Sequence, residues 1–262
     1  MNAALLAAVL ALAVAAPARA GTLLSLDFAD APLGPLAPGF PETACNAKWA
    51  DGLTEGRGVI VGPPEARRTK SLRVTYLAHK IGPEAAVQFP CRFEPRDRAY
   101  VEYWVRFGEG FDPVRGGKLP GLCGGHCNSG GHKPKEGEGF SARIMWKKEG
   151  NLILYLYHMD QPGVYGEVFD LKTAFPPGEW HKISERVALN KPGQRDGVVE
   201  VWLDDRQVLK KDGLRLRAKD DVKIDKMYFS TFYGGAEQDW APPKDETIAF
   251  DSFLVSDEPP AK

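Results

Sequence analysis

Apolar and polar residues alternate with a period of two along much of the chain. Segment 98–107 is the clearest case: one face would carry Ala99, Val101, Tyr103, Val105 and Phe107, and the other Tyr100, Glu102, Trp104 and Arg106. Successive side chains of a strand point to opposite sides of a sheet. The pattern therefore predicts a strand with one face in the core and the other in a solvated groove.

Clusters of β-branched and aromatic residues between glycine and proline turns predict further strands. They cover residues 71–77, 85–93, 140–146, 151–159, 166–171, 180–189, 198–209, 223–233 and 247–255. The pattern favours no helix. Short strands at this density are typical of an all-β sandwich or jelly roll.

The strands 140–146 and 151–159 are separated by a short connection, which predicts an antiparallel hairpin. Alternation places four polar or aromatic side chains on one surface of this hairpin: Ser141, Arg143, Tyr155 and Tyr157. Tyrosine is a common strand residue. The two tyrosines therefore indicate a function only in combination with other groups.

Residues 115–125 contain five glycines and one proline around a single lysine, Lys118. Glycine allows a ligand to approach the backbone closely. We interpret this segment as a loop between two strands that presents Lys118 to an anionic substrate. Arg115 is a further candidate cation, and Trp104 beside Arg106 could stack on a sugar and hold its carboxylate. The competing interpretation is a glycine-rich turn with a solvated lysine.

The four cysteines are even in number, which favours disulfides in an exported protein. The short spacing favours Cys123–Cys127, and this pairing leaves Cys45–Cys91. A zinc site is the alternative, because His126 and His132 flank the second thiol of the first pair. Their spacing fits no common zinc motif. The sequence therefore predicts two disulfides and no metal.

The N-terminus predicts a secretory signal peptide over residues 1–20. Residues 5–16 are uniformly apolar, and Ala18-Arg19-Ala20 matches the small-residue cleavage pattern. The apolar run is too short to span a bilayer comfortably, and no other segment is sufficiently apolar. We expect residues 21–262 to form a single domain that is secreted or periplasmic.

The net charge of −1 gives no indication of a nucleic-acid partner. Two enzyme classes are also disfavoured. Retaining glycosidases need two carboxylates about 5 Å apart, and the acidic strand 200–205 lacks their closely repeated acids. Serine hydrolases with a nucleophile elbow need Gly-x-Ser-x-Gly, which is absent from the sequence.

The candidate residues suit β-elimination on a polyuronate. Lys118 and Arg143 could neutralise the uronate carboxylate, which makes the adjacent C5 proton removable. Tyrosine could act as base and as acid. Its ordinary pKa of ~10 is high for a base, but nearby cations favour the phenolate and lower that pKa.

Several segments, taken in order along the chain, resemble polysaccharide lyase family 14: 103–107, 110–112, 116–122, 140–146, 155–157, 178–180, 196–197 and 229–235. Gly-Gly-Lys-Leu-Pro-Gly, residues 116–121, is the most specific of them. The resemblance implies a β-jelly roll of two antiparallel sheets with a groove on the concave sheet. It also implies cleavage of alginate or glucuronan without a cofactor, by a set of five residues: Lys118, Ser141, Arg143, Tyr155 and Tyr157.

We therefore expect a monomeric polysaccharide lyase whose partner is an anionic polysaccharide. Tyr155 and Tyr157 supply the acid and the base, either one role each or both roles from a single tyrosine. Two alternatives are a non-catalytic exported carbohydrate-binding jelly roll and an exported structural domain. The fold alone cannot separate them, because one fold hosts many functions.

Overall fold

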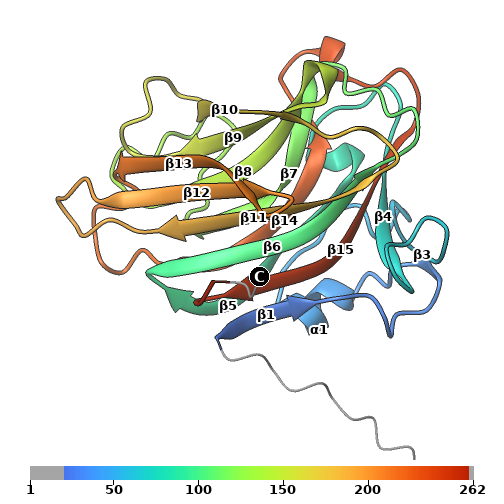
Figure 1. The fold of residues 1–262 in the computed structure, drawn as a ribbon, viewed down its shortest axis with the longest axis horizontal. Helices are drawn as coiled ribbons and strands as arrows, with labels where there is room; N and C mark the ends of the chain where they lie inside the picture. The colour runs from blue at the N-terminus through green and yellow to red at the C-terminus, as the bar shows by residue number, and fades with distance from the viewer. Residues whose placement is uncertain (1–20, 260–262) are drawn as a thin grey trace, which may run out of the picture.

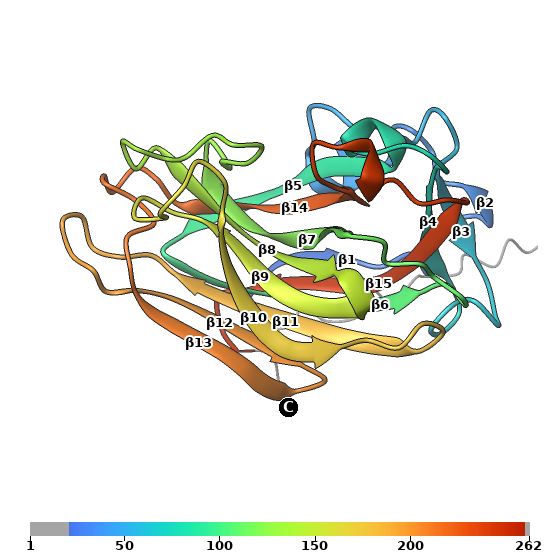
Figure 2. The ribbon, with the colours of Figure 1, turned by 90° about the horizontal axis from the view of Figure 1, so that it is seen from above.

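The computed structural model describes residues 21–259, and the predicted signal peptide 1–20 lies outside this range. The described chain forms two antiparallel β-sheets that stack face to face (Figures 1 and 2). This is the all-β jelly-roll sandwich that the strand pattern and the family resemblance predicted.

The larger sheet has nine strands. Its main path runs in the order β13 (Arg206–Leu214), β12 (Gly197–Leu203), β11 (Trp180–Ala188), β6 (Arg98–Phe107), β15 (Glu246–Ser256), β4 (Ser71–Tyr76), β3 (Gly58–Val61) and β2 (Gly34–Pro35), while β1 (Thr22–Leu26) pairs with β15. The six-stranded sheet has the order β10 (Glu167–Ala174), β9 (Asn151–Tyr157), β8 (Gly139–Lys147), β7 (Gly116–Gly125), β14 (Ile224–Tyr233) and β5 (Val87–Arg96).

Helical structure within residues 21–259 is short. One α-helix, α1 (Phe40–Cys45), has a proline in its first turn, where the missing N–H costs no hydrogen bond. Three 3₁₀ turns are η1 (Pro83–Ala85), η2 (Lys148–Gly150) and η3 (Gln238–Trp240). Over the same range, no helix has the length and apolar character needed to cross a membrane.

The inner faces of the two sheets meet in one aromatic-rich core. Trp146 is fully buried there, and its ring makes edge contacts with Tyr76, Phe107, Phe111 and Tyr233 at centroid separations of 5.3–5.9 Å. Edge-to-face packing is a preferred arrangement of aromatic rings. The cluster anchors β8, and the polar alternate residues of β8 consequently face away from the core.

The glycine-rich segment is a strand and not the predicted loop. β7 pairs with β8 on one side and β14 on the other, in the middle of the six-stranded sheet. A Cβ at Gly117 would lie 2.0 Å from the Trp146 ring, and one at Gly121 would lie 2.1 Å from the Ala142 carbonyl oxygen. These glycines are required by close packing within the protein. Their presence was therefore not evidence for an exposed loop.

The pairing of β7 is irregular next to Lys118. Its register with β8 shifts between Lys118 and Gly121. Two side chains of the opposite sheet bond to the backbone here: the Tyr103 hydroxyl donates to the Pro120 carbonyl at 2.9 Å, and Oε1 of Glu185 accepts from the Leu122 amide at 3.2 Å. Such irregularities re-aim side chains near functional sites.

Several other predictions can be compared with the structure. The hairpin of β8 and β9 is confirmed, with Arg143 opposite Tyr155. The predicted strand 198–209 is instead two strands, because Asp204 and Asp205 both adopt positive φ and form a turn between them. Both predicted disulfides are confirmed, namely Cys45–Cys91 and Cys123–Cys127.

Candidate active site

The outer face of the six-stranded sheet contains a hollow of about 570 Å³. Strand side chains form its floor, and segments 129–130, 165 and 234–240 contribute to its rim. The polar and charged residues that line it are Gln88, Lys118, Ser129, Arg143, Lys147, Tyr155, Tyr157, Tyr165, Tyr228 and Ser230. We call this hollow the groove.

Four of the predicted site residues meet in the groove. The antiparallel register of β8 and β9 sets Arg143 opposite Tyr155, with Tyr157 two residues further along β9. Lys118 of β7 lies opposite Met145 of β8. Because the alternate residues of these strands fill the core, these four side chains share the outer face.

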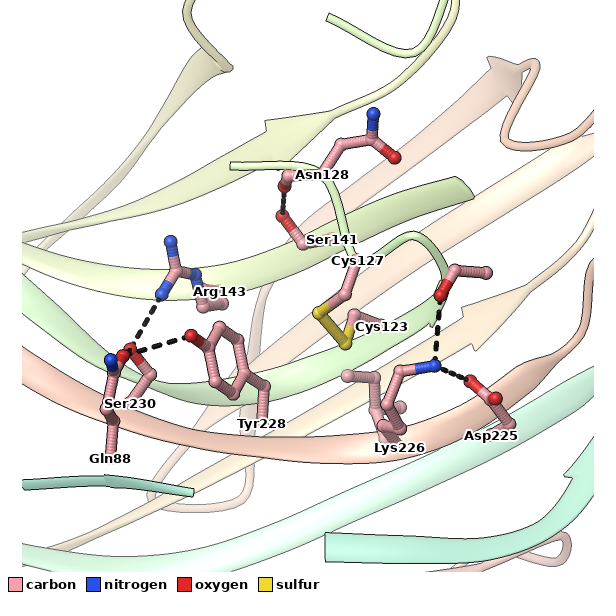
Figure 3. The surroundings of a disulfide bond; sticks show 12 residues. Gln88, Cys123, Cys127, Asn128, Ser141, Arg143, Asp225, Lys226, Tyr228 and Ser230 are labelled. Carbon is pink, nitrogen blue, oxygen red and sulfur yellow. Dashed lines mark hydrogen bonds and ion pairs between the residues drawn. A yellow bond between two sulfur atoms is a disulfide. The ribbon is translucent and has the colours of Figure 1, made fainter. Parts of the chain in front are cut away.

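Arg143 is a buried cation that contacts no carboxylate in the groove. Its side chain is 1% exposed, and Nη1 donates to the Ser230 hydroxyl at 3.3 Å (Figure 3). Within residues 21–259 its Nε has no hydrogen-bond partner. Burial lowers the pKa of the guanidinium, and neighbouring tyrosines oppose this shift. A buried charge is costly unless an opposite charge compensates it, so the site is suited to receive an anion.

Lys118 is half-buried on β7, so a strand, and not the predicted loop, presents it to the groove. Its Nζ lies 4.8 Å from the ring centroid of Phe232 and 5.5 Å from that of Tyr155. Burial, together with the charges of Arg143 and Lys147, lowers the pKa of Lys118 to about 7. The amine therefore exchanges between charged and neutral forms near neutral pH. A bound anion would raise that pKa again.

The two tyrosines form a hydrogen-bonded pair. Their hydroxyl oxygens are 3.4 Å apart. The Tyr157 hydroxyl also accepts from the Gly131 amide at 2.9 Å, and the Tyr155 hydroxyl accepts from the Gly166 amide at 3.2 Å. Burial raises the pKa of Tyr155, the contact with Tyr157 adds to the rise, and Arg143 offsets it only in part. The predicted lowering of a tyrosine pKa is therefore wrong for Tyr155.

Ser141 lies beneath the surface and does not line the groove. It is fully buried opposite Cys123, and its hydroxyl donates to the Asn128 carbonyl at 2.5 Å (Figure 3). Asn128 directly follows the Cys123–Cys127 disulfide. The serine therefore tethers the loop that supplies the Gly131 amide to Tyr157, and it can position this tyrosine without touching a substrate.

Trp104 and Arg106, predicted to bind substrate, do not line the groove that contains Lys118. Both lie on β6 in the nine-stranded sheet, with their side chains on its outer face. The guanidinium of Arg67 lies 3.7 Å from the Trp104 ring centroid, and Nε of Arg106 donates to the Gly178 carbonyl at 2.7 Å. The alternation of residues along a strand shows which side chains face outward. It does not show whether that strand belongs to the sheet whose outer face contains the groove.

Arg115 does not line the groove but lies behind Trp240, a residue that does. It forms an ion pair with Asp239, and its guanidinium lies 5.0 Å from the ring centroid of Trp240, which lines the groove. Lys147 approaches the same indole, with its Nζ 4.8 Å from the centroid. Two cations therefore lie near one aromatic ring at this end of the groove.

Residues of β5 and β14 were missing from the predicted site. Gln88 accepts hydrogen bonds from the hydroxyls of Tyr228 and Ser230 at 3.0 and 3.2 Å (Figure 3). Ser230 in turn contacts Arg143. Alternation within 223–233 places Tyr228, Ser230 and Phe232 on one face, and this signal could have identified them. No comparable local signal marked Gln88.

Among the residues of the groove, Lys118 and Arg143 place two cations beside the phenols of Tyr155 and Tyr157. Such a set can bind a carboxylate, accept a proton and donate a proton. No group of three or more His, Cys, Asp or Glu side chains suited to a metal occurs in the described part of the chain.

Comparisons with known proteins identify chains with this architecture. A family model described as Polysaccharide lyase 14 matches residues 64–253. The solved structure of alginate lyase Aly36B is 26% identical, with a TM-score of 0.79 over 90% of this chain and 97% of that chain. A marine alginate lyase from Aplysia kurodai is 26% identical, with a TM-score of 0.76 over 91% of this chain and 100% of that one.

A more distant structure shares the fold. The endo-β-1,4-glucuronan lyase of the fungus Trichoderma reesei is 13% identical, with a TM-score of 0.54 over 81% of this chain and 91% of that chain. Comparison with curated protein sequences gave no match.

Proposed function

The chain belongs to polysaccharide lyase family 14, and on that premise we propose that it cleaves a 4-linked polyuronate by β-elimination in the groove. The observation that carries this proposal is a pair of cations, the buried Arg143 and the half-buried Lys118, beside the hydroxyls of Tyr155 and Tyr157. Alginate is the first substrate to test, because two structures at 26% identity are alginate lyases.

Arg143 is assigned to the uronate carboxylate. Abstraction of the C5 proton builds negative charge on this carboxylate, and a cation in a site of low dielectric stabilises such charge strongly. Arg143 remains protonated under all ordinary conditions. Ser230 and Tyr228 hold the guanidinium in place through a hydrogen bond and a ring contact at 5.4 Å.

Lys118 is assigned to removal of the C5 proton. A general base works best when its pKa is close to the operating pH, and the pKa of Lys118 is lowered to about 7. The raised pKa of Tyr155 makes this phenol a poorer base than the sequence suggested. The assignment therefore moves the base role from a tyrosine to Lys118.

The tyrosine pair is assigned to protonation of the departing O4. A donor must keep its proton until the glycosidic bond breaks, and the raised pKa of Tyr155 keeps this phenol protonated. Tyr157 contacts both Tyr155 and the Gly131 amide. These contacts orient the Tyr157 hydroxyl, which can then pass a proton back to Tyr155 after Tyr155 has protonated O4.

Export is also proposed. Two disulfides are typical of an oxidising compartment. We propose that residues 1–20 are removed and that the single domain 21–262 acts outside the cytoplasm, as a secreted or periplasmic monomer.

The test is elimination itself. Purified protein is incubated with alginate, glucuronan or pectate, and ultraviolet absorbance of the new conjugated double bond is followed. We expect a continuous rise on alginate or glucuronan, and no rise with Lys118→Ala. Binding without an unsaturated product on any polyuronate would instead support the non-catalytic carbohydrate-binding alternative.

A further inference from the structure

A second hollow of about 470 Å³ adjoins the groove. Tyr228 and Ser129 line both hollows, which makes the two surfaces continuous. In Figure 3, Tyr228 lies between the group around Arg143 and the group around Lys226 and the Cys123–Cys127 disulfide. A chain that occupies the groove and continues past Tyr228 would therefore enter the second hollow.

Trp49 forms one wall of this second hollow. Its side chain is 44% exposed, and its ring meets that of Tyr228 edge-on with centroids 6.2 Å apart. A large indole left exposed beside a hollow offers an apolar platform. Carbohydrate rings have apolar faces that pack on such platforms, and the polar edge of the sugar stays available for hydrogen bonds.

The segment that carries Trp49 is anchored on both sides. Cys45 is linked to Cys91 on β5. Asp51 exchanges two backbone hydrogen bonds with Gln88, at 2.9 and 3.2 Å, and its carboxylate accepts from the Gln88 side chain at 2.7 Å. The indole is therefore held in position before any ligand binds, which reduces the entropy lost on binding.

The second hollow contains an uncompensated guanidinium. Arg92 lines it, and within residues 21–259 the buried Nε of Arg92 has no hydrogen-bond partner. Lys226 is already engaged by the Gly125 carbonyl at 3.0 Å and by Asp225 at 2.6 Å. Arg92 is thus the cation available to an incoming anion, and a guanidinium matches the planar geometry of a carboxylate.

We propose that Trp49, Arg92 and Tyr228 form an additional uronate subsite beyond the groove in which the bond breaks. The indole would pack on the sugar ring, and Arg92 would bind its carboxylate. The subsite rests on the proposed function for its substrate class. Trp49 precedes residue 64, where the family match begins, so the N-terminal segment of this chain supplies the platform.

The consequence is a dependence of affinity on substrate length. Oligosaccharides that reach past Tyr228 gain the contacts of the second hollow, and shorter ones do not. Removing Trp49 should therefore weaken the binding of long substrates and leave the shortest cleavable substrate unaffected. The chemical step occurs in the groove, and its rate at saturation should not change.

The experiment compares Trp49→Ala and Arg92→Gln with two matched controls. Trp202→Ala removes a half-buried tryptophan of β12 in the other sheet, and Arg96→Gln removes an arginine of β5 that already pairs with Asp257. Initial elimination rates are measured on polymer and on a ladder of size-defined oligosaccharides. For the two test variants we expect KM on the polymer to rise about tenfold, which corresponds to ~1.4 kcal/mol, with kcat unchanged.

Equal losses on the shortest and longest substrates, or no loss on any, would overturn the subsite. Affinities of size-defined oligosaccharides for the Lys118→Ala variant, with and without Trp49→Ala, provide a readout that needs no turnover. If the wild type binds these ligands but forms no unsaturated product, the elimination proposal fails while the length dependence still tests the subsite. If no polyuronate oligosaccharide binds, the subsite is overturned as well.

Discussion

The two outer faces of the sandwich carry similar residues in different electrostatic settings. Lys118 lies in the groove near aromatic rings, and Lys182 of β11 lies on the opposite outer face, 5.9 Å from the ring centroid of Trp104. Lys182 pairs with Asp205 at 2.6 Å and with Glu102 at 3.6 Å. Burial lowers the pKa of Lys182, but these carboxylates outweigh it and raise the pKa, whereas the pKa of Lys118 falls to about 7.

The arginines show the same contrast. Arg186 on the nine-stranded sheet forms an ion pair with Glu200, while the groups around Arg143 are hydroxyls and aromatic rings. Surface cations that are paired within the fold need no external partner. Cations that remain buried without a carboxylate destabilise the free protein, and strongly perturbed groups of this kind are typical of functional sites. Both faces carry lysine and arginine. In these two comparisons, only the cations of the groove lack a carboxylate partner within residues 21–259, and this difference marks the groove as the candidate site.

The largest expected effect comes from the two lysines. Lys118→Ala should reduce kcat by at least ~100-fold, because it removes a group assigned to proton transfer. Lys182→Ala is the matched control and should stay within about twofold of the wild type, because Lys182 lies on the nine-stranded sheet and does not line the groove. Initial elimination rates give the comparison, and thermal unfolding checks that both variants fold. Similar rates for the two variants would contradict the assignment of the groove.

The pH profile tests which role Lys118 plays. The kcat/KM profile reports groups of the free enzyme, and a base must be deprotonated to act. We therefore expect kcat/KM to rise with pH through about 7, the pKa of Lys118, and to stay high in the mildly alkaline range because the pKa of Tyr155 is raised.

Lys118→Arg separates the base role from a purely electrostatic one. Arginine stays charged, so this variant should be nearly inactive if Lys118 removes the proton. A variant that keeps its activity, together with a wild-type rate that falls above pH 7, would return Lys118 to the carboxylate-neutralising role suggested by the sequence.

The two arginines should affect stability in opposite directions. Arg143→Met removes an uncompensated buried charge and should leave the free energy of unfolding unchanged or raise it by about 1–2 kcal/mol. Arg186→Met removes the nearest cation from Glu200, which keeps Gln207 and Lys210, and should lower that free energy by roughly 1 kcal/mol. Denaturant unfolding measures both. Elimination should be lost only in Arg143→Met. Equal destabilisation by both changes would argue that the charge of Arg143 is compensated within the folded protein.

Glu185 lies in the core between the two sheets and should have a smaller, pH-dependent effect on the free energy of unfolding. It is buried in the core, and burial raises its pKa from 4.5 to about 8. Between these values the unfolded chain has lost the proton and the folded chain keeps it, so this group lowers stability as pH rises. Glu185→Gln keeps the acceptor for the Leu122 amide and removes the titration.

We therefore expect the stability advantage of Glu185→Gln to grow as the pH increases from about 5 to 8, by at most ~1.4 kcal/mol per pH unit. Chemical unfolding at several pH values measures this advantage. A constant difference across the range would show that Glu185 is ionised in the folded protein.

The smallest expected effect concerns the residues first assigned to substrate binding on β6. Trp104→Ala and Arg106→Ala should change kcat/KM by no more than about twofold, because these residues contact Arg67 and Gly178 in turns next to the nine-stranded sheet and do not line the groove. A tenfold loss in properly folded variants, measured on the polymer, would mean that this outer face also binds substrate.

Local patterns in the sequence determined much of the fold. The period-two alternation of 98–107 and the hairpin of β8 and β9 were predicted because strand periodicity and short connections are properties of neighbouring residues. Such patterns also placed Arg143, Tyr155 and Tyr157 on one face. The disulfides followed from cysteine number and spacing.

The same local patterns could not determine which surface is the site. Gly117 and Gly121 were interpreted as part of a ligand-binding loop. Their positions instead require glycine because a side chain there would collide with Trp146 or Ala142 on the neighbouring strand. Trp104 and Arg106 satisfied the same aromatic-and-cation pattern as the groove residues, yet β6 lies in the other sheet. In both cases the deciding neighbour is distant in the sequence.

Charge compensation was decided by tertiary structure alone. Arg143 meets Ser230 from β14, Lys182 meets Glu102 from β6, and no local pattern specifies either contact. Burial and pairing together determine the pKa values of such groups. The sequence by itself determined most of the strands, the alternation of their faces and the family. The packing of the two sheets decided which cations are paired and which remain available to an anion.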